Sequence, residues 1–308
     1  MQSKVMDTIQ KQVITFPGGM GDVNSYLITG ANGYTIIDTG MKLKEAITRW
    51  KAFMETGVKV EKVVLTHTHE DHIGLASWFQ EKYSIPIVVS RLGYHEMSRT
   101  AELTVEEFNQ FITKFGGPEV PEKYKQDPSI YTFTPDVLFE DKEEIMLGDE
   151  KYETIWTPGH AYDHFCFYNR ESEIMIVGDH ILKELSPVIG LWNAVERNPL
   201  EEYFTSLERI KEYPVKVALT GHGENIEHFQ RRINEIEERH HERLKQVLES
   251  IENQPKTARE ICQEIYGTTD VIIHLSSFMA TLTRLIYLES LGKAERIEQN
   301  GIISFQAL

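Results

Sequence analysis

One short segment, Val63–Gly74, limits the fold and chemistry of this chain more than any other. It opens with an apolar run that reads as a buried strand, and Thr-His-Thr-His-Glu-Asp-His follows directly. Imidazole nitrogens and carboxylate oxygens are the ligands that zinc and related cations take in proteins. A solvated polar loop would explain a single His-x-His, but not so dense a cluster. We therefore predict a metal centre that includes His67, His69, Asp71 and His72.

Three further candidate ligands follow other predicted strands, each beside a glycine. They are His160 in Thr-Pro-Gly-His, Asp179 in Val-Gly-Asp, and His222 in Thr-Gly-His-Gly. The carboxyl ends of strands are where α/β proteins gather their sites, and glycine lets the backbone turn tightly there. The four candidate ligands of the first segment are too few to hold two metal ions. We therefore predict that these three residues complete a centre for two ions.

The alternation of short apolar segments with amphipathic helices predicts α/β layers over most of the chain. Strands are expected at residues 12–16, 25–29, 34–38, 62–65, 85–89, 137–139, 152–156, 165–168, 174–177 and 215–219, and helices at 43–55, 75–83, 105–115 and 200–211. Residues 93–131 interrupt this alternation and read as an insertion with no strand of its own. We expect it to form part of a pocket wall or lid, or to pack onto the sheets through its aromatic residues.

After His222 the pattern becomes mainly helical. A charged helix is expected over 225–252, a second from a Thr257–Glu260 capping box to Ile265, and a third over 276–291 with Leu291 facing inward. A strand, a Gln-Asn-Gly turn and another strand follow over 293–305. We predict a catalytic domain over 1–238 and a small winged-helix-like α+β domain over 239–308.

Composition narrows the class of partner. The formal net charge of −16 repels phosphodiester backbones, which lowers the expectation of a nucleic-acid partner without excluding one. The two cysteines, Cys166 and Cys262, are far apart and form no disulfide framework. No apolar run is long enough for a membrane span and no leader peptide is evident. We expect a cytoplasmic protein that acts on a small molecule.

In this order, over residues 12–225, the motifs resemble those of the metallo-β-lactamase superfamily. The resemblance implies an αββα sandwich whose site lies along one edge of the paired sheets. It also implies two metal ions, one held by His67, His69 and His160, the other by Asp71, His72 and His222, with Asp179 bridging them. His69 stands where the flavin-partnered di-iron branch carries Glu. We therefore expect zinc, with iron and manganese as alternatives because the same ligands accept all three.

The expected reaction is hydrolysis by a hydroxide that bridges the two metal ions, on a thioester, lactone or related ester. Asp71 is expected to orient the hydroxide and to pass its proton to the leaving group. Three alternatives stay open. They are a single-strand ribonuclease with the same centre, an iron-dependent persulfide dioxygenase, and a non-catalytic regulator that senses a ligand.

The C-terminal part resembles the winged-helix domain of one group of metallo-β-lactamase proteins. Its third helix carries Arg284 as its only basic residue, whereas binding in a DNA groove needs several. Packing or homodimer formation is therefore favoured over DNA binding.

The remaining histidines are weighed individually. His164 and His180 are expected behind the ligands, and His95 at the pocket mouth. Glu70 is expected to point aside. Surface or packing roles are expected for His228, His240, His241 and His274.

Overall fold

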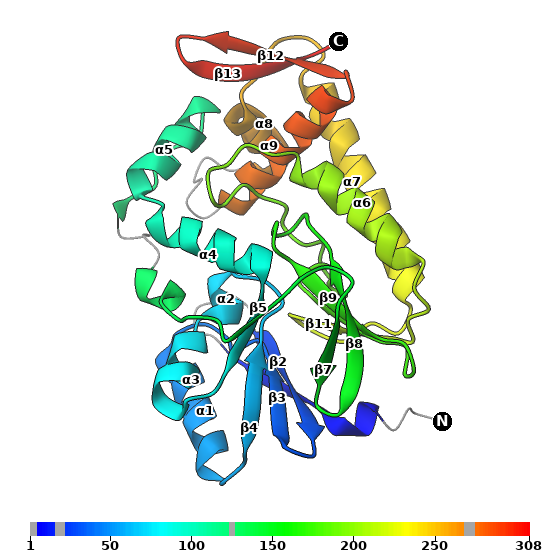
Figure 1. Ribbon diagram of the computed structural model, residues 1–308. Helices are drawn as coiled ribbons and strands as arrows, with labels where there is room; N and C mark the ends of the chain where they lie inside the picture. Colours follow the sequence, from blue (N-terminus) through cyan, green and yellow to red (C-terminus); the bar gives the residue numbers. More distant parts are fainter. Residues whose placement is uncertain (1–4, 16–21, 123–126, 268–274) are drawn as a thin grey trace.

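Two β-sheets form the centre of the molecule in the computed structural model, which describes residues 5–15, 22–122, 127–267 and 275–308 (Figure 1). The first sheet has the order β1-β2-β3-β4-β5-β6, antiparallel from β1 to β3 and parallel from β3 to β6. Its strands are β1 (Ile9–Ile14), β2 (Val23–Gly30), β3 (Gly33–Ile37), β4 (Val60–Val64), β5 (Ile87–Ser90) and β6 (Val137–Phe139).

The second sheet has the order β11-β10-β9-β8-β7, and only the β10–β11 pair is parallel. Its strands are β7 (Glu144–Leu147), β8 (Glu150–Trp156), β9 (Phe165–Asn169), β10 (Ile174–Gly178) and β11 (Val217–Thr220). The two sheets share a core to which the first contributes Tyr26 and Val64 and the second contributes Phe165, Phe167 and Ile176. This core faces both sheets, so each sheet needs cover only on its outer side.

Helices cover both outer faces. α1 (Lys44–Glu55) and α3 (Ala76–Tyr83) pack on the first sheet, where the buried rings of Trp50 and Phe79 meet edge to face at 5.2 Å. α6 (Pro199–Lys211) and α7 (Phe229–Ser250) lie over the second sheet. The mixed α/β metallo-β-lactamase arrangement expected from the motifs is therefore present, as four layers of helix, sheet, sheet and helix.

The C-terminal part contains three helices and a hairpin, as predicted. α7 leads to α8 (Ala258–Tyr266) and α9 (Leu275–Ser290), and an antiparallel pair, β12 (Ala294–Gln299) and β13 (Ile302–Ala307), ends the chain. The Thr257–Glu260 capping box is confirmed. Leu291 is 47 % exposed, so the prediction that it faces inward is wrong. It lies beyond the last residue of α9, where the chain has left the packed face.

One continuous apolar core joins this part to the second sheet. It contains Val177 of β10, Leu207 of α6, Leu244 of α7 and Phe278 of α9. The predicted division between residues 238 and 239 falls inside α7. Residues on both sides of this boundary contribute to the same core, so the C-terminal part has no separate core that would mark a domain. The two-domain division stays a prediction.

The insertion over 93–131 has no strand among its described residues. It holds α5 (Val105–Lys114), as predicted, the 3-10 helix η3 (Pro128–Tyr131), and most of α4 (Arg91–Glu102), which the sequence analysis missed. Phe115 is fully buried in the core shared with the C-terminal helices, and Gly117 approaches Phe278 of α9. Phe108, Phe111 and Tyr131 also pack against the cores, whereas Tyr94 is 36 % exposed; Tyr124 lies outside the described residues.

Two strand predictions differ from the structure. The first strand was expected over 12–16, whereas β1 begins three residues earlier, at Ile9. β7 was not predicted at all; it is short and half-exposed, with Met146 facing outward. Short edge strands carry too few apolar residues to give a clear period-two signal.

Candidate metal centre

All seven predicted ligands come together at one edge of the sandwich. The loop after β4 carries His67 and His69, and the short helix α2 (Glu70–Ile73) begins immediately afterwards and carries Asp71 and His72. The other three follow the ends of β8, β10 and β11. Their ligand atoms form two groups, each with all members within 4.8 Å of one another: His67, His69 and His160, and Asp71, His72, Asp179 and His222.

The first group consists of imidazoles only. His67 Nε2 lies 3.1 Å from His69 Nδ1, and the ring of His160 stands 4.6 Å from that of His69, nearly perpendicular to it. Burial lowers the pKa of His67 well below its usual value and that of His69 to about 3, and it also lowers that of His160. These imidazoles are therefore neutral at physiological pH, which is the state that binds a metal.

The second group mixes imidazoles and carboxylates. His222 Nε2 lies 3.3 Å from Asp71 Oδ2 and 3.2 Å from Asp179 Oδ2, and His72 Nε2 lies 3.4 Å from Asp179 Oδ1. Burial opposes charge here, yet the facing carboxylates raise the pKa of His72 well above its usual value and that of His222 to about 10. Against the same cost of burial, these imidazoles lower the pKa of Asp71 to about 2 and hold that of Asp179 well below its usual value.

Asp179 connects the two groups. Besides its contacts with His72 and His222, its Oδ2 lies 3.5 Å from His160 Nε2. Gly221 makes room for this carboxylate, because a Cβ at that position would overlap Asp179 Oδ1 and come within 2.9 Å of His72 Cε1. The glycine after β11 is thus required by close packing against the centre.

The second ring nitrogen of four candidate ligands is oriented by a partner. His160 Nδ1 lies 2.8 Å from the Val188 carbonyl and His222 Nδ1 2.8 Å from the Asp22 carbonyl. His67 Nδ1 meets the Thr66 hydroxyl at 2.9 Å and His72 Nδ1 meets Asp38 Oδ2 at 2.8 Å. Such outer contacts fix the tautomer and aim Nε2 at a metal.

The residues present fit a metal ion. The Nε2 atoms of His72 and His160 and Oδ1 of Asp179 are fully buried and have no hydrogen-bond partner. A buried polar atom without a partner costs free energy, and here three such atoms belong to two groups that meet at Asp179. A divalent cation is the partner that nitrogen and carboxylate donors in this arrangement suit.

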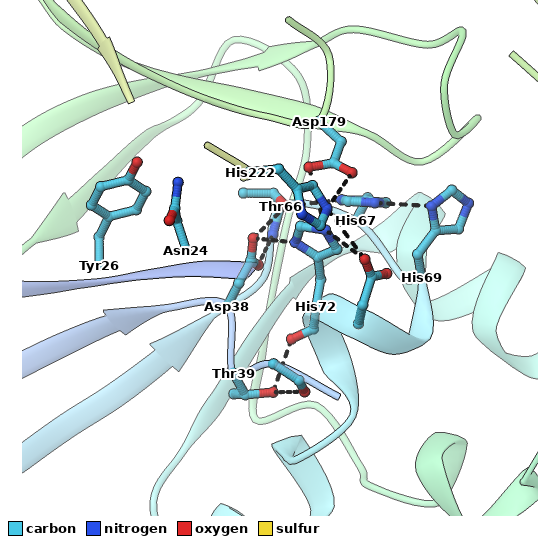
Figure 2. A network of polar contacts seen from close by, with 12 residues as sticks. Asn24, Tyr26, Asp38, Thr39, Thr66, His67, His69, His72, Asp179 and His222 are labelled. Atoms are coloured by element: carbon cyan, nitrogen blue, oxygen red, sulfur yellow. Dashed lines mark hydrogen bonds and ion pairs between the residues drawn. The ribbon is translucent and has the colours of Figure 1, made fainter. Parts of the chain in front are cut away.

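Asp38 is a site residue that the sequence analysis missed. It follows β3, is 2 % exposed and has φ of +56°. Figure 2 shows it reaching both Thr66 and His72: Oδ1 accepts from the Thr66 amide at 2.9 Å, and Oδ2 accepts from the Thr66 hydroxyl at 2.8 Å. The sequence did contain the signal, since Asp38 ends an apolar strand just as Asp179 does.

Two side chains of β2 were also missed. Tyr26 Oη donates to the Thr220 carbonyl at 2.7 Å, and Asn24 Nδ2 donates to the carbonyls of Thr220 and Gly223 at 2.9 Å each. They tie the turn that carries His222 to the first sheet. No local pattern could reveal them, because the contact joins residues nearly 200 positions apart.

The remaining histidines lie as follows. His164 is fully buried behind Asp179, whose amide donates to His164 Nε2 at 3.2 Å. His180 is fully buried next to His164, with ring centroids 5.6 Å apart. A cavity opens beside the centre, next to His69 and His160. His95 is exposed and does not line this cavity, so its predicted place at the pocket mouth is wrong. The helix α4 turns Glu96 and Thr100 toward that cavity instead.

Glu70 belongs to neither ligand group, although its Oε1 is buried. His228 and His241 are exposed, and His240 is buried in packing between α6 and α7. His274 lies outside the described residues.

Within the described part of the chain, no helix is long and apolar enough to cross a membrane.

Comparison with known proteins identifies the family. The model of the metallo-β-lactamase superfamily matches residues 18–222, two thirds of the chain. The chain belongs to this superfamily. The prediction of a metallo-β-lactamase-like hydrolase is thereby confirmed at the level of the family, while the number and identity of the metal ions are not.

Similar proteins span nearly the whole chain. A probable metallo-hydrolase of Bacillus subtilis, YqjP, is 28 % identical over 84 % of this chain and 85 % of its own. An atrochrysone carboxyl ACP thioesterase of Aspergillus fumigatus is 23 % identical over 83 % of this chain and 70 % of its own. The crystal structure of a metallo-β-lactamase family protein from Thermus thermophilus superimposes with a TM-score of 0.85 at 26 % identity, covering 98 % of this chain and 99 % of that one. The C-terminal helices and hairpin are therefore part of the shared arrangement, although none of these matches identifies them as a winged helix.

Proposed function

We propose that this protein is a hydrolase that uses two divalent metal ions, zinc in the first place, on a small thioester, lactone or ester. The observation that carries the proposal is the position of Asp179. One carboxylate lies within 3.5 Å of the Nε2 atoms of His72, His160 and His222, which belong to two different ligand groups. A carboxylate in that position suits a bridge between two cations.

Each ligand group would hold one ion. His67, His69 and His160 would hold the first, Asp71, His72 and His222 the second, and Asp179 both. When bound, such a pair of ions polarises a substrate oxygen and makes water a nucleophile at neutral pH. Asp38 fixes the ring of His72, and the Val188 carbonyl fixes that of His160.

Asp71 is the residue we assign to proton movement. Its side chain is 28 % exposed, whereas those of Asp179 and His72 are 7 % and 0 % exposed. Among these residues of the centre, it is the carboxylate that substrate and solvent can reach. It can accept a proton from water and deliver it to a leaving group nearby.

Thioesters head the substrate classes because a relative that covers most of this chain is named as a thioesterase. Nucleic acid is a poorer candidate, given the net charge of −16. We also propose that the last helices and hairpin form a winged-helix-like unit that serves packing or dimer formation. Arg284, the one basic residue between Ser276 and Leu291, is only 8 % exposed, which leaves it little access to phosphates. The two cysteines are buried and unpaired, which suits the cytoplasm.

The first experiment is metal analysis of the purified protein, followed by assays of thioesters, lactones and esters before and after chelation. We expect about two zinc or manganese ions per chain and hydrolysis that is lost on chelation and restored by metal. His95→Ala is the matched control, since that histidine is exposed and lies outside both ligand groups. About one iron per chain with oxygen uptake on a persulfide, or cleavage of single-stranded RNA in place of the esters, would overturn the proposal.

A further inference from the structure

A cavity of about 70 Å³ opens beside the three-histidine group. His69 and His160 line it next to the centre, together with Thr68 and Gly159. Residues of α4, the segment after His160, the loop before α6 and the start of α6 form the rest. One water molecule needs a cavity of roughly 10–15 Å³ on the same scale. The cavity therefore has room for a small group of a substrate that reacts at the centre.

The charged lining of this cavity is unbalanced. Three carboxylates line it, those of Glu96, Asp163 and Glu202, against one cation, Arg197. With all four groups ionised, these side chains together carry a charge of −2, before the charge of a metal ion held by His69 and His160 is added.

Glu96 forms an ion pair with Arg197, the cation of the lining. Its Oε1 lies 3.2 Å from Arg197 Nη2, and its Oε2 accepts from Asn193 Nδ2 at 2.5 Å. The guanidinium also stacks on Tyr162, with Cζ 3.5 Å from the ring centroid. Arg197 is thus held by a carboxylate and an aromatic face, and its charge is already matched by Glu96.

Asp163 and Glu202 are the surplus charges. Asp163 is 3 % exposed, and its Oδ2 is buried with no hydrogen-bond partner. Among the described residues, no lysine, arginine or histidine nitrogen forms a salt bridge with either carboxylate within 4.0 Å. Burial raises the pKa of Asp163 to about 6, against hydrogen bonds to Thr68 that lower it, and burial also raises the pKa of Glu202, against the nearby charge of Arg197.

We propose that this cavity binds a small cationic group of the substrate, an ammonium, against Asp163 and Glu202. The inference rests on the proposed function, because it assigns the substrate class of the same centre. Trp192 also lines the cavity and offers an aromatic surface, which attracts cations. The chain as a whole, at −16, draws cations and repels anions.

The test measures binding separately from turnover. Thioethers are used because they cannot be hydrolysed and can bind with either end in the cavity. The three compounds are the S-ethyl thioether of thiocholine, its neutral isostere ethyl 3,3-dimethylbutyl sulfide, and an analogue that ends in a carboxylate. Calorimetry on the metal-loaded protein at low ionic strength should give at least about tenfold tighter binding of the cation than of the isostere. Equal binding, or tighter binding of the neutral or anionic compound, would overturn the proposal.

Two variants locate the effect. Glu202→Gln and Asp163→Asn should each reduce the preference for the cation about threefold or more while leaving affinity for the neutral isostere unchanged. Glu208→Gln is the matched control for Glu202→Gln, because Glu208 is an exposed carboxylate of the same helix, α6, and lies outside the cavity. Circular dichroism and metal content identify a misfolded Asp163 variant, in which case Glu202→Gln decides. A preference that survives in a correctly folded Glu202→Gln protein would contradict the assignment.

Failure of the proposed function looks different. If the cation binds preferentially but acetylthiocholine and neutral thioesters, lactones and esters all resist hydrolysis, the cavity assignment stands and the hydrolase proposal falls. If neutral thioesters are hydrolysed and the cationic thioether has no advantage, the reverse holds.

Discussion

Buried histidines occur in two regions of this molecule, and the two are built differently. At the metal centre, four of the candidate ligands have one ring nitrogen held by a named partner and Nε2 directed at another ligand side chain. Between α6 and α7, His240 is 3 % exposed and neither of its ring nitrogens has a partner. Its ring packs against those of Tyr203 and Phe204, at 5.4 and 5.8 Å.

This difference teaches that burial of a histidine does not indicate a site by itself. A ligand needs one nitrogen fixed and the other free to face a metal. His240 lacks the first feature, and no carboxylate is among the groups that shift its pKa. We therefore expect changes at the centre to alter metal content and turnover, and changes at His240 to alter only stability.

The largest effect is expected from Asp179→Ala. This change removes the carboxylate that contacts both ligand groups, so we expect kcat/KM to fall more than about 100-fold, beyond the range of outer-contact losses. Steady-state kinetics and elemental analysis of the same preparation measure it. Asp179→Asn keeps the shape and removes the charge, so it should also be impaired. Turnover equal to that of the parent protein would refute the bridging role.

A second comparison sets a ligand against its neighbour. His160→Ala should lose metal, whereas His164→Ala should retain most of it, because His164 only accepts from the Asp179 amide and meets the Thr157 hydroxyl. Metal per chain after dialysis against a weak chelator gives the answer. If the two variants lose metal equally, His164 is a ligand and the assignment of the first group is wrong.

Asp38→Asn should have a smaller effect. The amide keeps the volume of the side chain but loses the charge beside His72 Nδ1, so metal affinity should fall about 10–100-fold. Competition with a zinc indicator measures the change. Asp7→Asn, an exposed carboxylate of the N-terminal 3-10 helix (Met6–Thr8), is the control for charge alone. An affinity within twofold of the control would mean that Asp38 only shapes the Thr66 loop.

The sequence predicted which seven residues come together at this edge of the sandwich, because they follow strand ends in short turns with glycine, a local pattern. Asp38 shares that pattern. It was missed because it contacts a candidate ligand, His72, and is not itself a member of the ligand groups. Tyr26 and Asn24 could not be found, because their contacts with the His222 turn join distant parts of the chain. The cavity charges were equally hidden, because α4, Asp163 and α6 meet only in the folded protein.

The smallest effect concerns pH and His240. Burial, then the nearby charges of Arg284 and His241, lower the pKa of His240 to about 3, whereas an unfolded histidine has about 6.5. Between these values the unfolded chain binds a proton that the folded chain does not. The stability that the neutral ring contributes is therefore complete above pH 6.5 and is lost as the pH falls toward 3.

His240→Leu removes this proton. We expect little change in the free energy of unfolding at pH 8, and at pH 5 a variant more stable than the parent by at most about 1.4 kcal/mol per pH unit below 6.5. Urea unfolding at the two pH values measures the difference, and metal content and turnover should stay at parental levels. A parallel loss of stability in both proteins would mean that the acid sensitivity does not come from His240. A loss of metal in the variant would contradict the distinction between the two kinds of buried histidine.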